Sequence, residues 1–326
     1  MKNSHFLIIL TAVFLQCSVA DAQHFVSDKE DAIIVKNNTL MVVLMEKDEK
    51  AIKKLAKKPE ELKAYEQSVD MFNDYLKKAI QNEWSYSKNV EYISQDEAEH
   101  LKRRKDPGYC LLEAVELRNY KLGDFYSPDP SGGFNSPHDL AYHISQVDKT
   151  NALAIKWAAS PKKEIACSYF PAIGISMTSV TFMIQHLRNQ LEDAVAKDLT
   201  RVSRLKKYVK GRTGELANKT LLIPEPLLSK GLKKAIEKGT IDKFYDYQVE
   251  VVDVTRHEKY VLEKNGNYAY AWVIPARAQR RGKTLFNYFI IDAKDGRILY
   301  LTGKAVVGAN GLFHQGQLML VNNRIK

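Results

Sequence analysis

Apolar and polar residues recur with two different periods along this chain, and the order of those periods predicts helices and strands in turn. Apolar residues three or four apart over Pro59–Glu83 predict a long amphipathic helix, with Pro59 in its first turn, where an N–H is not needed. Met177–Lys197 has the same spacing, and Thr178 or Ser179 is the expected N-cap.

The remaining elements are predicted by the same reasoning. Strands are expected at residues 40–45, 90–93, 109–117, 152–158, 165–170, 221–223, 247–254, 268–275, 285–292 and 298–301. Shorter helices are expected at residues 96–104, 198–212, 227–238 and 255–262, the last with Thr255 as its N-cap. Asp295-Gly296 between two strands is a strong hairpin signal.

Two stretches of the chain begin and continue alike. Asn-Asn-Thr-Leu at residues 37–40 and Asn-Lys-Thr-Leu at residues 218–221 each open an apolar run, and Leu-Lys-Lys-Ala-Ile follows in both. A short polar helix and a strand around Tyr109 or Tyr268 complete each copy. We therefore predict a duplicated unit whose two copies share one strand-helix-strand-helix-strand order.

The fold class predicted from this order is mixed α/β or α+β. It consists of two tandem related units, each a mixed or mainly antiparallel sheet with helices packed largely on one face. Residues 23–197 form the first α/β domain, including a proline- and glycine-rich loop at 122–138. A basic helical connector at 198–217 joins it to a second α/β domain at 218–326. The topology is similar to small α/β modules of bacterial envelope proteins, which leaves function open.

Residues 1–22 have the pattern of a signal peptide. Lys2 precedes an apolar stretch at 6–14, and Ala-Asp-Ala at 20–22 predicts cleavage before Gln23. We therefore expect a secreted or periplasmic protein with no transmembrane span in the mature chain. Lipidation of Cys17 is disfavoured, because Gln16 occupies the position where a small residue is expected before a lipidated cysteine.

The amino-acid composition indicates a globular protein with a net positive charge. The chain has 326 residues, 45% hydrophobic and 27% charged, which is ordinary for globular proteins and argues against disorder. Its formal net charge is +10, with basic clusters at 102–105, 201–212 and 277–283. Arg277, Arg280, Arg281 and Lys283 have no acidic neighbour within their cluster and are candidates for contact with an anion; solvated surface charge is the alternative.

Few residues suggest chemistry. His138, Asp139 and His143 are weak candidates for a metal site, since imidazole and carboxylate bind zinc, but a surface pair beside a helix start is the favoured reading. The chain lacks a nucleophile elbow, a Cys-x-x-Cys motif, a phosphate-binding loop and a dinucleotide fingerprint. We therefore assign no catalytic or cofactor-binding residue, expect no cofactor, and find no specific nucleic-acid motif.

Two cysteines remain after the predicted cleavage, Cys110 and Cys167, each within a strand-like run. In an oxidising compartment a cross-strand disulfide between them is one reading, and two buried thiols are the other. The sequence leaves both open, because it does not show whether the two Cβ atoms meet.

The sequence favours a non-catalytic interaction or binding protein of the cell envelope, with an unidentified protein or an anionic envelope polymer as its partner. Two alternatives stay open. One is a metal-dependent or hydrolytic enzyme that uses residues 122–143, and the other is a binder of an anionic polymer or membrane surface through the basic clusters.

Overall fold

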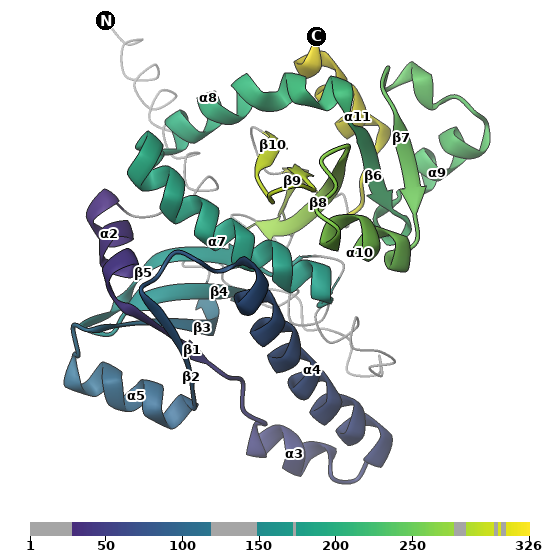
Figure 1. The fold of residues 1–326 in the computed structure, drawn as a ribbon. Coiled ribbons are helices and arrows are strands. Elements are labelled where there is room, and N and C mark those ends of the chain that lie inside the picture. The colour runs from purple at the N-terminus through teal and green to yellow at the C-terminus, as the bar shows by residue number, and fades with distance from the viewer. Residues whose placement is uncertain (1–27, 119–148, 172–173, 277–284, 303–305, 308–310) are drawn as a thin grey trace, which may run out of the picture.

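Two mixed β-sheets follow one another along the chain, each with helices packed against it (Figure 1), which confirms the predicted fold class. The computed structural model describes residues 28–118, 149–171, 174–276, 285–302, 306–307 and 311–326. Within these ranges, no helix is both long enough and apolar enough to cross a bilayer.

The first sheet has the strand order β2-β1-β3-β4-β5. Strand β1 pairs in parallel with its two neighbours, β2 and β3, whereas β3, β4 and β5 pair in antiparallel. The strands of this unit are β1 (Thr39–Val43), β2 (Asn89–Ile93), β3 (Tyr109–Arg118), β4 (Lys149–Trp157) and β5 (Ser160–Tyr169). Its helices are α2 (Lys29–Asn37), α3 (Glu49–Leu55), α4 (Pro59–Glu83) and α5 (Gln95–Arg104).

The second sheet repeats this order as β7-β6-β8-β9-β10, with β11 pairing to β9. Again the first strand of the unit, β6, pairs in parallel on both sides, with β7 and β8, and the last three strands of that order are antiparallel. The strands are β6 (Thr220–Pro224), β7 (Val249–Val252), β8 (Tyr268–Ala276), β9 (Leu285–Asp292), β10 (Ile298–Leu301) and β11 (Val306–Val307). The helical elements are η3 (Glu225–Leu227), α9 (Lys230–Glu237), η4 (Ile241–Lys243), α10 (Val254–Leu262) and α11 (Gln315–Ile325).

Between the two sheets the chain forms α7 (Met177–Lys197), α8 (Val202–Arg212) and η2 (Thr213–Asn218). Helix α8 packs on β10, and η2 packs on α11, so both contact the second unit. The domain limits drawn from the sequence remain predictions.

The two units match residue by residue from the second strand to the third. Ser94 caps α5 and Asp253 caps α10. Lys105 and Lys264 follow at equal spacing, both with φ of 53°, and β3 and β8 then begin equally far along the chain. Positions in α5 and β3 can therefore be matched one for one with positions in α10 and β8.

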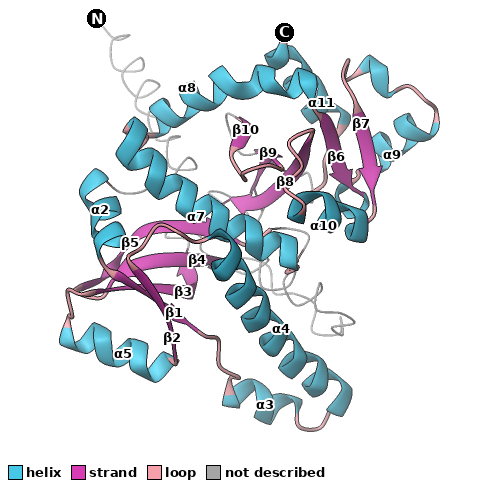
Figure 2. Ribbon diagram, in the orientation of Figure 1, coloured by secondary structure: helices cyan, strands magenta, loops and turns pink. Residues whose placement is uncertain are grey.

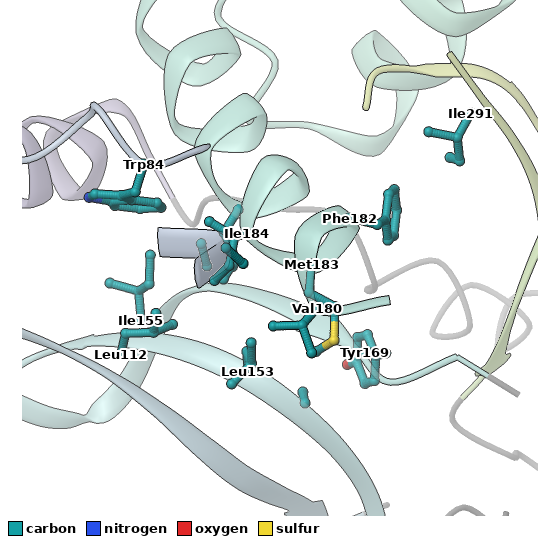
Figure 3. Packing of buried hydrophobic residues seen from close by; sticks show 14 of the residues in the cluster. Trp84, Leu112, Leu153, Ile155, Tyr169, Val180, Phe182, Met183, Ile184 and Ile291 are labelled. Atoms are coloured by element: carbon teal, nitrogen blue, oxygen red, sulfur yellow. The ribbon is translucent and has the colours of Figure 1, made fainter. Parts of the chain in front are cut away.

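Helix α7 lies between the two sheets and is buried on both sides (Figures 1 and 2). Every residue from 178 to 187 is buried, which is typical of a helix inside a core. Figure 3 shows Met183 pointing toward Leu153 of the first sheet and Phe182 pointing the other way, toward Ile291 of the second. Phe182 also packs on Trp272, with 4.8 Å between ring centroids. One helix thus completes the cores of both units.

The two sheets present opposite faces to α7. On β1, Leu40 and Val42 join the core that contains α7. On β6, the matching residues Leu221 and Ile223 lie in a separate core on the far side, and Leu222 takes the inner position instead. Accordingly α4 packs beside α7 in the first unit, and α10 does so in the second. Helix α5, the counterpart of α10, therefore lies on the outer face of the first sheet.

The helix starts differ slightly from the predicted ones. Ser176, not Thr178 or Ser179, is the N-cap of α7, and it exchanges hydrogen bonds with Ser179 in a capping box. Asp253 caps α10, so the prediction of Thr255 is wrong by two positions. In both cases the cap is an extended residue that precedes the apolar period, and that period alone does not locate it.

Cys110 and Cys167 lie on β3 and β5, with β4 between them. Cys110 is opposite Trp157, and Cys167 is opposite Ala154. Two strand spacings amount to about 10 Å, beyond the Cα separation of about 7 Å that a disulfide tolerates. The structure accordingly forms no disulfide between them. The expectation of a buried thiol is met by Cys110, whereas Cys167 is half-buried.

This placement predicts the reactivity of the thiols. Burial raises the pKa of the Cys110 thiol to about 12. We expect an alkylating reagent at pH 8 to leave Cys110 unmodified in the native protein, because the thiolate reacts and the thiol does not. Intact mass of a Cys167→Ser variant would measure this. In denaturant without reductant, the wild-type chain should take up reagent at both cysteines; a requirement for reduction would contradict the strand separation.

Two buried histidines lie beside the central helix. His186 of α7 stacks on Phe182 and lies 3.1 Å, through its Nδ1, from Ser168 Oγ. His257 of α10 packs edge-on against Tyr270. Burial lowers the pKa of each imidazole to about 4. Both rings are therefore neutral in the folded protein at neutral pH.

Stability should therefore fall as the solution is acidified. Unfolded histidine binds a proton below a pKa of about 6.5, so the contribution of neutral burial is complete above that pH and is lost as pH falls toward 4. Each ring should account for a loss of about 2 kcal/mol between pH 7 and pH 5. Urea denaturation of wild type and His257→Leu at both pH values would measure it. Equal pH dependence in the two proteins would show that His257 titrates normally.

Candidate functional site

A cavity of about 230 Å³ opens where β1 ends. After β1 the chain crosses to β2 on one side, and it then returns across β1 to form β3 on the other. Helix α4 packs on one face of the sheet and α5 on the opposite face. In open α/β sheets, ligands bind at such a reversal of strand order, outside the carboxyl ends of the strands. The cavity therefore lies where this kind of sheet binds ligands.

Helix α5 supplies the polar side of the cavity. Gln95, Glu99 and Lys102 line it from one helical face, four and then three residues apart. The start of the helix is fixed by Ser94, whose side chain and backbone form a capping box with Glu97. The Gln95 N–H also donates to Glu46 Oε1 at 3.0 Å, which ties the helix start to the segment that follows β1.

Three apolar residues where β1 ends also line the cavity, Val43, Leu44 and Met45. The backbone of Met45 is held by Asn73 of α4, which accepts from its N–H and donates to its carbonyl, both at 2.9 Å. This part of the lining is thus fixed by a side chain from the opposite face of the sheet.

Four charged side chains, Glu99, Lys102, Glu113 and Lys156, form a continuous network and are named the charged network here. The first three line the cavity, and Lys156 joins them through Glu113. Glu113 is only 11% exposed, and its Oε2 accepts from Lys102 Nζ at 2.6 Å. Its Oε1 lies 2.9 Å from Lys156 Nζ. Lys102 also donates to Glu99 Oε1 at 2.9 Å. Positive and negative groups therefore alternate along the network.

These contacts shift the pKa values of Lys102 and Glu99. Burial lowers the pKa of Lys102, but its hydrogen bonds to Glu113 and Glu99 outweigh burial and raise that pKa above its ordinary value. The hydrogen bond from Lys102 holds the pKa of Glu99 below its usual range. Lys102 and Glu99 are therefore both charged at neutral pH.

The second unit shows which side chains the same strand order has at these positions when they face α7. Three members of the network, Lys102, Glu113 and Lys156, are largely buried and are named the buried triad here. The matching positions in the second unit hold Val261, Trp272 and Ile291. All three are buried in the core that contains α7. The same strand order is therefore built with apolar side chains where these positions face α7, so the strand order by itself does not require the charges.

Buried ion pairs of this kind contribute little net free energy to the stability of the fold. Desolvation of the ions offsets much of their attraction, and apolar residues of similar volume are often equally stabilising. Together with the internal comparison, this makes the buried triad a functional candidate.

The site residues predicted from the sequence lie elsewhere. His138, Asp139 and His143 fall outside the described residues, and so do Arg277, Arg280, Arg281 and Lys283. In the part of the chain that the structure describes, no three His, Cys, Asp or Glu side chains form a group that could hold a metal ion.

Sequence reasoning missed the charged network. It noted Lys102 only as part of a basic cluster and Glu113 only as part of a strand. One signal was present, because Glu113 follows Cys110-Leu111-Leu112 within an otherwise apolar run. An acid at such a place is rarely buried without a partner. Its partner Lys156 could not be predicted from the sequence, because only the register of β3 against β4 brings Lys156 close to Glu113.

Comparisons of the chain with protein-family models, curated proteins and solved structures find no match. The chemistry of the cavity follows from its own side chains. The charged network offers fixed donors and acceptors, and apolar residues at the end of β1 line the same cavity. Such a lining can orient a small molecule that has both polar and apolar groups.

The role of the buried triad in stability can be measured. We expect Glu113→Leu to lower the free energy of unfolding by about 3 kcal/mol, because it leaves two largely buried ammonium groups without their shared carboxylate. A variant with Lys102→Val, Glu113→Leu and Lys156→Ile together, the apolar triad variant, should recover most of that loss. Chemical denaturation would compare them, with Glu99→Gln as an exposed control. A triple variant as unstable as the single one would show that the fold needs the charges.

Proposed function

We propose that this protein is a secreted or periplasmic, non-catalytic binding protein of the cell envelope, and that it holds a small polar ligand in the cavity at the end of β1. The observation that carries the proposal is the buried triad, which occupies positions that the second unit fills with apolar core residues. Charges that the strand order by itself does not require, placed beside a cavity at a reversal of strand order, suit ligand recognition.

Two further features support the compartment and the origin of the fold. The signal-peptide pattern of residues 1–22 supports export from the cytoplasm. The shared strand order and the matched spacing of α5 and α10 support duplication of one α/β unit. A protein of this kind would pass its ligand to, or hold it near, an unidentified protein or an anionic polymer of the envelope. The basic cluster at 277–283 is the candidate contact for that partner.

The pairing within the charged network favours binding over catalysis. Both oxygens of Glu113 have an ammonium group within 3 Å, and Lys102 donates to two carboxylates. A general acid or base must reach the reacting atom directly or through one water. Groups held by each other are better suited to fixing the orientation of a bound molecule.

The proposal is tested by binding to the wild-type mature chain and to the apolar triad variant. A library of small molecules extracted from cell envelopes would be screened by thermal unfolding. We expect a compound to stabilise the wild type, by about 2.7 kcal/mol at a hundredfold excess over Kd, and to leave the variant unchanged. Lys78→Met, which removes an exposed charge on α4, is the matched control and should behave as wild type.

Mass spectrometry of the recovered compound separates binding from catalysis. The compound should return unchanged after prolonged incubation with the protein. Chemical conversion would overturn the non-catalytic part of the proposal. If every stabilising compound acted equally on the wild type and the apolar triad variant, the assignment of the binding site to this cavity would be wrong.

A further inference from the structure

The charged network has no formal net charge. Two ammonium groups, on Lys102 and Lys156, face two carboxylates, on Glu99 and Glu113, and each charge is already in contact with one of opposite sign. A ligand with its own net charge would bring an uncompensated charge into a partly buried site, which is unfavourable. Electrostatics at this cavity therefore select against both anions and cations.

The network still offers hydrogen bonds. Each ammonium group has three donors and each carboxylate about four acceptor positions, so the contacts within the network leave donors and acceptors over. Gln95 on the same wall adds an amide that both donates and accepts. Hydroxyl groups fit such a lining, because each one donates and accepts, and hydrogen bonds to charged partners are stronger than those between neutral groups.

Part of the lining comes from apolar residues. Val43, Leu44 and Met45 line the cavity where β1 ends, and Ala98 of α5, itself buried, also lines it. A sugar ring or a cyclic polyol has apolar C–H faces as well as hydroxyl groups, so it would meet both kinds of surface. The cavity volume of about 230 Å³ is below the range of about 300–1,000 Å³ found for drug-sized ligands, which suits one ring better than a chain of rings.

Resting on the binding function proposed above, we propose that the cavity binds an uncharged, hydroxyl-rich small molecule, of the class of monosaccharides and cyclic polyols. Glu113 and Glu99 accept hydrogen bonds from the hydroxyl groups of the ligand, and Lys102 donates to the ligand's oxygens. Lys156 does not line the cavity; it holds Glu113 and balances its charge. The second unit has no counterpart of this site within its described residues, because Val261, Trp272 and Ile291 take up the matching positions.

The test uses matched sets of sugars that differ only in charge. Neutral hexoses of the gluco, galacto and manno series, with their amino and uronic acid forms and with inositol, would be titrated against the mature chain by NMR. We expect a neutral member to bind, and its amino and uronic acid forms to bind at least about tenfold more weakly, a difference of 1.4 kcal/mol or more. The Lys78→Met control should keep this preference.

Two variants change the sign of the network and make the test specific. Lys156→Met leaves a net negative charge and should move the preference toward the amino sugar. Glu113→Gln leaves a net positive charge and should move it toward the uronic acid. A purely structural role for these residues would weaken all ligands alike. Equal weakening of all ligands would overturn the proposed ligand class. So would a preference of the wild type for a charged sugar, or a failure of every neutral member to bind.

The failure of this inference is distinct from failure of the proposed function. If a library compound without hydroxyl groups, or with a net charge, stabilises wild type but not the apolar triad variant, the cavity is a binding site and only the ligand class is wrong. If no compound distinguishes those two proteins, the binding function itself is wrong.

Discussion

The burial of one helix between two sheets is the constraint on which the rest of this structure depends. Helix α7 has no exposed residue from 178 to 187, so neither sheet has a complete core without it. Met183 and its neighbours pack on the first sheet, and Phe182 packs on Trp272 of the second. Removing either sheet would expose apolar surface of α7 to water, which is unfavourable in proportion to its area. The packing of one unit is therefore linked to that of the other through this helix.

That shared helix breaks the symmetry between two units that have the same strand order. Only one face of each sheet can meet α7, and the two sheets use opposite faces. Helix α10 packs in the shared core, whereas its counterpart α5 lies on the outer face of the first sheet. Positions that must be apolar in the second unit can therefore hold polar or charged side chains in the first. There Lys102, Glu113 and Lys156 take the places that Val261, Trp272 and Ile291 occupy beneath α7.

Local patterns were enough to predict most elements, and the order of those elements was enough to predict two mixed sheets. Pro59 began its helix as expected, and Asp295-Gly296 joined two antiparallel strands. Caps were less accessible, because Ser176 and Asp253 stand outside the apolar period. Helices α2, α3 and α11 were not predicted; α3 has no buried residue, so tertiary packing leaves little trace in its sequence. The two-sided burial of α7 and the contact of Glu113 with Lys156 both depend on long-range packing and register, which no local window contains.

The buried triad differs from the ion pairs that are common on protein surfaces. An exposed pair contributes little to stability and can arise without selection for structure. Glu113 is different, because its side chain is almost fully buried and would be very unfavourable there if either lysine were missing. Three charged residues from α5, β3 and β4 must therefore be present together. The second unit has apolar residues at the matching positions and needs no such pairing of charges. Apolar side chains of similar volume are often as stabilising as a buried ion pair, so stability alone is a weak reason to keep three matched charges. A contact with something besides one another is a better reason, and the adjoining cavity is where Lys102 and Glu113 can make that contact.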